Sequence, residues 1–299
     1  MKRMNLTEVR NEKKRILDHF ASFSEANGIK YSISYGTMLR AISHGVWIPW
    51  DDDVAVILLR EDWDRFFCLY DNDENDRFKV VNNKIDKHVH TKIGYMYDCY
   101  THMKPRNNAE FSGFNAIQID IYPLDCIPAP GLKRNIFMGR TRLLGILAKL
   151  CDVSRGNPGG NRSRAKIVLA SLINIVMKPF DASWFIQRQT TLAHKYDRKF
   201  TEQQKASNDV NMLCTNIRQM PIVPYAIMTK HTKIDFEGSS YCMIQDYDTF
   251  LKARYGKYMD LPPESQRSCY TYNTEEYYIE DEYYEEAQKT DSPYVDEWC

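Results

Sequence analysis

Residues 47–57 read Trp-Ile-Pro-Trp-Asp-Asp-Asp-Val-Ala-Val-Ile, in which three successive carboxylates run directly into an apolar strand. Successive side chains of a strand point to opposite faces, so we expect Asp51, Asp53 and Ala55 to share one face. Two carboxylates on one face can hold a hard divalent cation such as Mg²⁺. Ala55 stands where a third carboxylate would complete the pattern. The stretch therefore indicates a metal site that is one carboxylate short.

Alternating and helical patterns on both sides of this stretch predict an α/β domain. Helices are expected over residues 8–27, about 37–44 and from 60 onward. Strands are expected over residues 31–35, 53–58, 77–81, 90–97 and 115–122. The candidate chemistry therefore lies in the N-terminal part of the chain.

The turn at Gly36 and Thr37 lies between a strand and a helix, where backbone N–H groups bind phosphate well. Gly36 lets the backbone approach a ligand closely, and Thr37 adds a hydroxyl. A further carboxylate comes from residues 115–125, where Asp120 lies inside an otherwise apolar strand. Burial of an unpaired Asp is costly, so Asp120 is a functional candidate, whereas Asp125 follows a Pro and is expected to cap a turn.

Charge is distributed unevenly along a chain of zero formal net charge. Residues 133–205 contain fifteen Lys or Arg and four Asp or Glu, whereas residues 270–299 contain ten Asp or Glu and one Lys. The basic segment suits an anionic partner such as phosphate, a nucleotide, nucleic acid or a membrane surface, or it is a solvated helical face. The acidic tail holds seven tyrosines, unlike a disordered tract, and we expect it to pack on the basic segment.

The changes in charge and in secondary-structure pattern along the sequence divide the chain into four expected parts. They are a catalytic core over 1–130, a basic helical region over 131–220, a part that completes the core over 221–269, and the acidic tail over 270–299. Eight scattered cysteines without metal-ligand spacing predict reduced thiols in a cytoplasmic protein. The N-terminus has no signal-peptide pattern, and the longest apolar run, residues 167–177, is too short to span a bilayer.

Five blocks of the sequence together resemble the LicD family of phosphocholine transferases, which also includes the fukutin-related ribitol-phosphate transferases. The central blocks are Gly-Thr-Met-Leu at 36–39, Ile-Pro-Trp-Asp-Asp-Asp-Val at 48–54 and Arg-Glu-Asp-Trp-Asp-Arg-Phe at 60–66. The later blocks are Ile-Asp-Ile-Tyr-Pro-Leu-Asp at 119–125 and Tyr-Gly-Lys-Tyr-Met-Asp-Leu-Pro-Pro at 255–263. The resemblance runs from about residue 30 to residue 267, with a variable basic middle.

The resemblance implies a nucleotidyltransferase-like α+β fold, in which helices flank a mixed sheet. It implies transfer of phosphocholine from CDP-choline to a glycan hydroxyl, with release of CMP. It further implies Mg²⁺ or Mn²⁺ held by Asp51, Asp53 and Asp120, where Asp120 is a ligand or the base for the acceptor hydroxyl.

The resemblance also implies contacts with the donor from Gly36, Thr37, Arg40, His44 and Trp50. Gly36 and Thr37 would hold the phosphates. His44 either contacts the donor phosphate or closes its helix. Trp50, together with Trp47, either forms a pocket for a choline-like cation or belongs to the core.

Three positions depart from the family pattern, which usually has Asp at position 55, Gly at position 40 and Arg at position 43. Arg40 and Ser43 form a compensating pair in this interpretation, since one cation is kept a turn away on the same helix. Ala55 has no such compensation, and the missing carboxylate predicts weak metal binding and low turnover. Either an Asp→Ala substitution has inactivated the chain, or a natural variant works with the three remaining aspartates.

Three functions stay open at this point. The first is a metal-dependent phospho-alcohol transferase acting on a cell-surface or lipid-linked glycan, with CDP-ribitol or CDP-glycerol as alternative donors and the basic helices facing the acceptor or a membrane. The second is a transferase-fold protein that has lost catalysis and binds or regulates. The third acts on nucleic acid and is disfavoured, because the chain lacks an aromatic–basic RNA motif.

Overall fold

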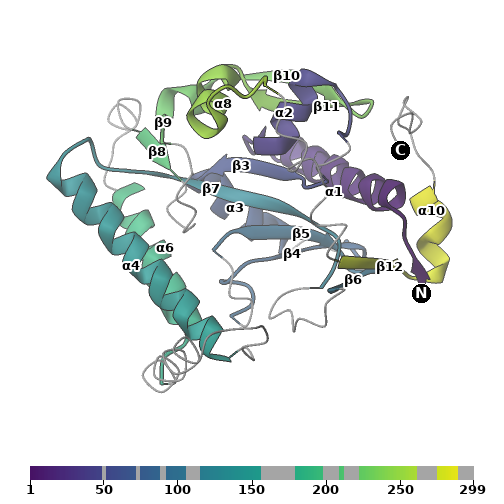
Figure 1. The fold of residues 1–299 in the computed structure, drawn as a ribbon, viewed down its shortest axis with the longest axis horizontal. Helices are drawn as coiled ribbons and strands as arrows, with labels where there is room; N and C mark the ends of the chain where they lie inside the picture. The colour runs from purple at the N-terminus through teal and green to yellow at the C-terminus, as the bar shows by residue number, and fades with distance from the viewer. Residues whose placement is uncertain are drawn as a thin grey trace.

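The computed structural model describes residues 1–48, 52–71, 75–87, 92–105, 115–155, 179–197, 209–211, 222–260 and 275–288. Within these ranges the fold is α+β, as the sequence predicts (Figure 1). A mixed sheet runs through the middle of the molecule, and a pair of long helices forms one edge. The described part of the acidic tail lies at the opposite end.

The central sheet has the strand order β2 (Ser32–Ile33), β3 (Ala55–Leu59), β7 (Gln118–Cys126), β5 (Gly94–Asp98) and β4 (Phe78–Val81). β3 and β7 run parallel, and the other neighbours on this path are antiparallel. The short strands β8 (Asp209–Asn211) and β9 (Val223–Pro224) extend the sheet from the end of β7. Each of the five strands expected from the sequence is therefore present, close to its predicted range.

Two helices cover one face of the sheet, α1 (Leu6–Ala26) and α3 (Arg60–Tyr70). Their aromatic side chains meet over β7, where the rings of Phe20 and Phe66 lie 4.9 Å apart and Ile119 is fully buried. Because side chains alternate along a strand, the neighbouring Asp120 points to the other face. That other face carries a row of half-buried polar and aromatic side chains, namely Tyr95, Tyr97, Gln118, Asp120 and Tyr122.

A layer from the C-terminal half closes over α2 (Tyr35–Ser43), which follows β2. It consists of the turn η1 (Tyr225–Thr229), the hairpin of β10 (His231–Phe236) and β11 (Ser239–Ile244), and α8 (Tyr247–Tyr255). Its buried side chains, among them Phe236, Tyr241 and Phe250, belong to the same hydrophobic cluster as those of α1 and β3. Residues 222–255 thus complete the core that the N-terminal part begins.

The described part of the basic region forms two helices, α4 (Leu132–Arg155) and α6 (Ala182–Asp197). They pack against each other through a small cluster that includes Ala148, Phe185 and Ile186. Figure 1 shows them along the left edge of the molecule. None of the helices in the described ranges combines the length and the apolar character that a membrane crossing requires.

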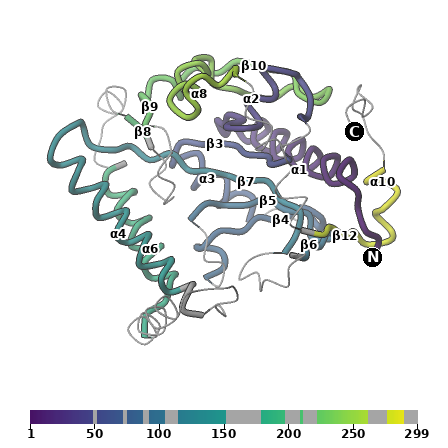
Figure 2. Tube along the Cα trace, viewed as in Figure 1, coloured from purple at the N-terminus to yellow at the C-terminus, as the bar shows by residue number. Residues whose placement is uncertain are grey.

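The acidic tail packs on the N-terminal part of the chain, and the prediction that it packs on the basic helices is wrong for residues 275–288. Strand β12 (Glu275–Ile279) lies between β1 (Lys2–Arg3) and β6 (Thr101–Pro105) and pairs with both. The turn η3 (Asp281–Tyr283) and helix α10 (Tyr284–Gln288) follow, and α10 contacts α1. Figure 2 shows the yellow end of the trace beside its purple start and far from α4.

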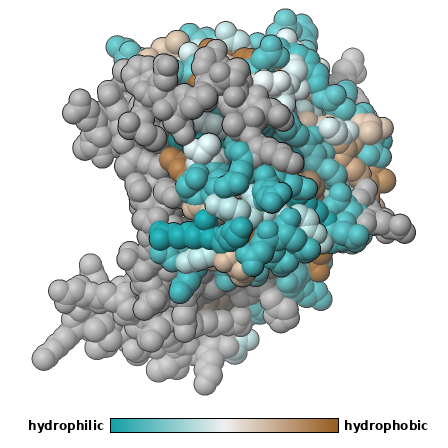
Figure 3. All heavy atoms as spheres, turned by 90° about the vertical axis from the view of Figure 1, so that its right-hand side faces the viewer, coloured by the Kyte–Doolittle hydropathy of each residue, from teal (hydrophilic) through white to brown (hydrophobic). Residues whose placement is uncertain are grey.

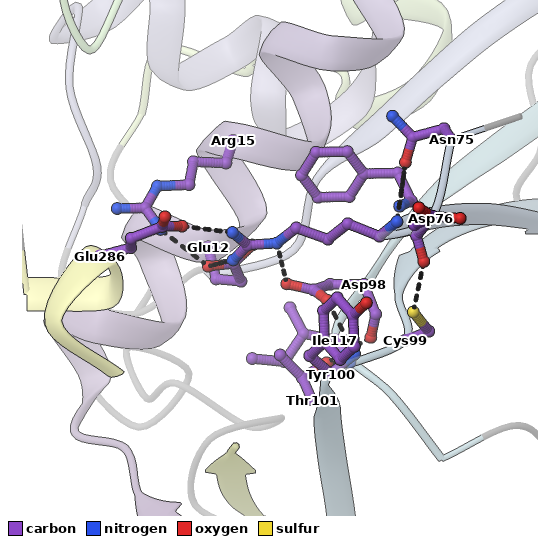
Figure 4. A network of polar contacts seen from close by, with 12 residues as sticks. Glu12, Arg15, Asn75, Asp76, Asp98, Cys99, Tyr100, Thr101, Ile117 and Glu286 are labelled. Atoms are coloured by element: carbon purple, nitrogen blue, oxygen red, sulfur yellow. Dashed lines mark hydrogen bonds and ion pairs between the residues drawn. The ribbon is translucent and has the colours of Figure 1, made fainter. Parts of the chain in front are cut away.

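Arg77, just before β4, joins three acidic side chains from distant parts of the chain, Glu12, Asp98 and Glu286, which are labelled in Figure 4. Its guanidinium lies 3.2 Å from the Glu12 carboxylate of α1 and 2.9 Å from that of Asp98, and it also pairs with Glu286 of α10. Arg15 approaches Glu12 to 3.3 Å. Burial and a hydrogen bond to Asp98 nevertheless raise the pKa of Glu12 to about 8, against the two arginines. The cluster therefore ties the tail to α1 around a carboxyl that titrates near neutrality.

Asp125 is part of a buried ion pair, and the expectation that it caps a turn is wrong. It lies near the end of β7 with its side chain fully buried, and the buried guanidinium of Arg60 binds it through two hydrogen bonds of 2.7 and 3.0 Å. The guanidinium also lies 4.8 Å from the ring of Trp63. This pair fixes the start of α3 against the end of β7.

Replacing Arg60 by Met should lower the free energy of unfolding by about 3–5 kcal/mol, because it leaves the Asp125 carboxylate buried without a cation. The matched control is Lys252→Met, which breaks an ion pair whose two side chains are 65% and 47% exposed and should leave stability almost unchanged, because solvent screens the pair. Guanidinium denaturation followed by circular dichroism measures both. Equal losses would contradict the assignment of Arg60 and Asp125 as a structural pair.

Glu12→Gln should change how stability depends on pH. The ordinary pKa of the Glu12 carboxyl is 4.5, whereas its folded pKa is about 8. Between these values the folded chain holds a proton that the unfolded chain has lost, so this group's contribution to stability falls as pH rises toward 8. The stability of Glu12→Gln relative to the parent should therefore increase from pH 5 to pH 8, by at most about 1.4 kcal/mol per pH unit.

Denaturant midpoints at several pH values measure this difference. Glu25→Gln is the matched control, since Glu25 lies on the same helix but is half exposed beside Lys233. A parent and a Glu12→Gln variant with parallel pH profiles would show that Glu12 is ionised in the folded chain throughout this range.

Candidate functional site

The predicted carboxylate site lies at the amino ends of the parallel strands β3 and β7. Ala55 pairs with Asp120 in the β3–β7 ladder, and Tyr95 of β5 pairs with Asp120 on the other side. Paired residues of neighbouring strands share a face, so these three side chains form one row on the face away from α1 and α3. A carboxylate at position 55 would therefore stand directly beside Asp120.

Asp120 is held in a setting that favours its protonated form near neutrality. The Tyr122 hydroxyl donates a 2.8 Å hydrogen bond to its Oδ2 atom. Burial, followed by the nearby charge of Asp53, raises the pKa of Asp120 to about 7, while the Tyr122 bond and the charge of Lys13 oppose the shift. A carboxyl with this pKa can take up or release a proton at neutral pH, which suits a general base.

Lys13 of α1 is the central cation of the site, and the sequence analysis missed it. Its buried Nζ atom donates a 2.9 Å hydrogen bond to the backbone carbonyl of Asp52 and lies 3.5 Å from the Asp52 carboxylate and 3.7 Å from that of Asp53. Burial lowers the pKa of Lys13, but the charges of Asp52, Asp53 and Asp120 outweigh it and keep the pKa above its usual value. Lys13 is therefore a permanent ammonium among the carboxylates.

The sequence does contain a signal for Lys13. The buried positions of α1 include Val9, Ile16, Leu17 and Phe20, which recur at helical spacing. Lys13 follows Val9 by four residues and precedes Leu17 by four, so it belongs to the apolar face of the helix. A lysine on a buried helical face needs a buried partner, and the aspartates of 51–53 are the candidates.

The two neighbouring aspartates have opposite surroundings. The Asp52 side chain is 2% exposed and lies against Lys13, whereas the Asp53 side chain is 68% exposed. β3 starts at Ala55, so Asp53 lies just before the strand. Asp53 can therefore reach a ligand from solvent, while Asp52 holds the segment on α1.

Thr37 and Arg40 fasten α2 to the backbone of the carboxylate segment. The Thr37 hydroxyl accepts a 3.0 Å bond from the N–H of Ala55, and its oxygen lies 3.3 Å from the carbonyl of Asp53. The Arg40 guanidinium donates to Thr37 and to the same Asp53 carbonyl. Both side chains are fully buried. Their visible role is to position Asp53, and contact with a donor stays a prediction for both.

Gly36 lies in the first turn of α2, whose leading backbone N–H groups have no acceptor within the helix. The preceding Tyr35 has φ 51°, an unfavourable left-handed conformation for a non-glycine residue. Its ring packs 5.4 Å from the rings of both Tyr122 and Phe250, which hold it in place. The strained residue Tyr35 therefore stands at the amino end of α2, where backbone N–H groups can bind an anion.

The remaining predicted site residues are His44, Trp50 and Asp51. His44 is at the C-terminal end of α2, opposite Gly36, where its Nδ1 atom lies 2.7 Å from the Ser43 hydroxyl. Asp51 and Trp50 fall outside the described residues. The Trp47 ring is covered by internal cations, with the guanidinium carbon of Arg40 at 4.8 Å and that of Arg10 at 5.7 Å from its centre. Trp47 also packs against the main hydrophobic cluster, which favours the alternative that this residue belongs to the core, and a choline pocket stays a prediction.

The described part of the site supplies two of the expected metal ligands, Asp53 and Asp120. Their carboxylate oxygens match the hard donors that Mg²⁺ and Mn²⁺ prefer. No cluster of three or more His, Cys, Asp or Glu side chains with metal-binding geometry occurs within the described ranges. The third expected ligand, Asp51, lies outside them, so the donor chemistry fits while the full ligand set stays a prediction.

A cavity of about 1350 Å³ lies apart from these residues, between α3 and α6. Its walls include Trp63, Asp64, Asn82, Lys84 and His194. Asp64 lies 2.7 Å from Lys84 and 3.4 Å from His194, so the carboxylate in the cavity wall is paired with neighbouring basic side chains. It contains none of the predicted site residues, and it does not bear on the chemistry at Asp120.

Comparison with known proteins adds two findings. Residues 28–139 match the family described as LicD/FKTN/FKRP, nucleotidyltransferase domain. The chain is also 24% identical over 270 residues to the lipopolysaccharide cholinephosphotransferase LicD of Haemophilus influenzae (strain ATCC 51907 / DSM 11121 / KW20 / Rd), over 89% of this chain and 96% of that protein. The family match contains Gly36, Asp53 and Asp120, whereas Lys13 precedes it.

Lys13→Met should destabilise the chain by about 3–5 kcal/mol, because the Asp52 carboxylate would stay buried without its cation. Lys233→Met is the matched control, since it removes the partner of a half-exposed Glu25 and should cost less than about 1 kcal/mol. Urea denaturation measures both variants. A Lys13→Met variant as stable as its control would show that Lys13 does not carry the structural role assigned to it.

Proposed function

We propose that this chain, whose residues 28–139 belong to the LicD family, transfers phosphocholine from CDP-choline to a hydroxyl group of a glycan and releases CMP. The family resemblance predicted from the sequence is confirmed, and a LicD-type transferase is the function that it supports. The relative is named for phosphocholine transfer to lipopolysaccharide, which supports choline as the alcohol and a glycan as the acceptor.

The observation that carries the proposal is the convergence of three chemical elements at one edge of the sheet. An exposed carboxylate, Asp53, lies near a half-buried carboxylate, Asp120, whose pKa responds to its charge. The amino end of α2 lies beside them at Gly36, because Thr37 and Arg40 bind the backbone of Asp53. Acidic ligands next to an anion-binding helix end suit a metal-bound diphosphate.

Under this proposal Asp53 and Asp120, with Asp51 from outside the described residues, hold Mg²⁺ or Mn²⁺. The cation would neutralise charge on the diphosphate and assist departure of CMP. The backbone N–H groups at Gly36 and Thr37 bind the phosphate oxygens. Lys13 compensates the carboxylates and keeps Asp53 in position.

Asp120 also has the properties of the base. With a pKa of about 7, its carboxylate can accept the proton of the acceptor hydroxyl as that oxygen attacks the transferred phosphorus. The hydrogen bond from Tyr122 orients the carboxylate. We propose that Asp120 acts as metal ligand or base, depending on how completely the aspartates before β3 bind the cation.

Ala55 bears on whether the reaction runs at full rate. Its side chain stands beside Asp120 in the β3–β7 ladder, so an aspartate there would add a carboxylate on the metal-facing side. The backbone around it is fully bonded, because its N–H donates to Thr37 and its carbonyl accepts from the Ser34 N–H at 2.9 Å. Under this proposal the backbone of the transferase site is intact at position 55, and only the carboxylate of the side chain is missing.

The described cysteines support a cytoplasmic setting for this reaction. Cys99 and Cys242 are thiols, and burial raises the pKa of each. Reduced thiols of this kind persist inside cells, where nucleotide-activated alcohols would be the donors.

Restoring an acidic side chain tests the proposal. Ala55→Asp should raise the rate of CMP release from CDP-choline in the presence of Mg²⁺ by about 10–100-fold, which is the size of effect that a single supporting group at a metal site has on activity. Adding Asp120→Asn to that variant should lower the rate by about 10²–10⁴-fold, because ligand and base are both lost. Asp64→Asn is the control, since Asp64 lies away from the site beside Lys84.

Parallel assays with CDP-ribitol and CDP-glycerol identify the transferred alcohol. If CMP is released faster from CDP-ribitol or CDP-glycerol than from CDP-choline, the chain is still a transferase, but the transferred alcohol is ribitol or glycerol and not choline. If Ala55→Asp releases no CMP from any of the three donors with glycan acceptors present, the alternative is correct and the chain is a transferase-fold protein that binds or regulates.

A further inference from the structure

We propose that the outer face of α4 is a docking surface for an anionic lipid bilayer. This face carries a stripe of large apolar side chains that the fold leaves in solvent. Leu132, Ile136, Leu143 and Ile146 are 74%, 54%, 55% and 52% exposed. With 3.6 residues per turn, the four positions fall within an arc of about 80°. The stripe therefore follows one side of the helix for four turns.

The stripe is separate from the side of α4 that the core uses. Phe137, Ala148 and Cys151 are buried and face the α6 side of the molecule. Phe137 and Ala148 fall on the opposite half of the helix from Leu132 and Leu143, and Cys151 lies about a quarter turn from these two residues. A helix that only covers a core needs one apolar side, whereas α4 has two.

Basic side chains border the stripe on both sides. Lys133 and Arg140 lie roughly a quarter turn from it in one direction, and Arg142 and Lys149 lie roughly a quarter turn away in the other. All four residues are exposed, and the exposed residues of α4 from Leu132 to Lys149 include no carboxylate. An apolar stripe between two rows of Lys and Arg is the arrangement of helices that lie in the headgroup region of a membrane.

The start of α6 extends this chemistry at the same end of the molecule as the last described turns of α4. Phe180 and Trp184 are 46% and 48% exposed, and the Arg188 guanidinium lies 5.0 Å from the Trp184 ring. Amphipathic aromatic side chains favour the boundary between lipid and water. By contrast, the described side chains at the opposite end of the molecule are mostly hydrophilic (Figure 3).

The charge pattern favours a bilayer over a second copy of the chain. A symmetric dimer through α4 would bring the same four cations of each copy together, and like charges at close range oppose association. Anionic headgroups instead neutralise both rows while the apolar stripe enters the acyl boundary. Each basic residue near such a surface adds to binding, and added salt weakens it.

Vesicle sedimentation tests the docking surface with the full chain. Vesicles of phosphatidylcholine and phosphatidylglycerol should bind the protein at low salt, and vesicles of phosphatidylcholine alone should bind it at least about tenfold more weakly. Ile136→Glu combined with Leu143→Glu should reduce binding to the anionic vesicles by about tenfold or more. Arg140→Gln combined with Lys149→Gln should reduce it similarly.

The matched control is Leu69→Glu combined with Ile222→Glu, which adds the same charges at apolar positions that are 39% and 44% exposed outside α4. It should bind vesicles like the parent. Equal binding by the α4 and control variants overturns the proposal, as does an absence of parental binding to anionic vesicles. Concentration-dependent dimers that the α4 variant abolishes, without vesicle binding, assign the face to a second copy instead.

A second measurement does not depend on loss of binding. Leu143→Trp should gain fluorescence quenching by brominated acyl chains in anionic vesicles, relative to the parent, because residue 143 would lie at the acyl boundary. Leu69→Trp should gain none. Equal quenching in the two variants contradicts insertion through α4.

Discussion

The ammonium of Lys13, buried against Asp52, connects the first helix of the chain to the segment that precedes β3. This single contact orders the site in two ways. It offsets the cost of burying Asp52, and it leaves Asp53 as the side chain that faces solvent. On the opposite side, Thr37 and Arg40 bind the same short segment to α2. The segment before β3 is therefore held by α1 on one side and by α2 on the other, and these contacts do not require a ligand.

The motifs single out a candidate site in the sequence because the spacing of polar residues within a strand is a local property. Asp120 was recognisable as an acidic residue between isoleucines, and the structure places it beside position 55. Lys13 was not recognised, because its partner lies 39 residues away and the pairing is tertiary. Its place among Val9, Ile16 and Leu17 marked it as buried, but only the fold shows which charge it meets.

The errors at Asp125 and in the tail share a physical cause. A carboxylate after a Pro is equally consistent with a turn cap and with a buried ion pair, and Arg60 decides between them from 65 residues away. The acidic tail was expected on the most basic segment of the sequence. In the structure it lies where β1 and β6 offer backbone partners and where Arg77 lies between Glu12 and Asp98. Net charge along a sequence does not show which strand edges are open.

The position of β12 between β1 and β6 has a consequence for how the protein is made. The second and third residues of the sequence pair with residues 278 and 279, so the first strand finds its partner only after β12 has been synthesised. Glu12, one residue before Lys13, likewise meets Arg77 together with Glu286. The helix that carries the central cation of the site is therefore secured by residues 275–288. A nascent chain therefore contains the carboxylate segment and β7 before β1 and α1 can make their contacts with β12 and α10.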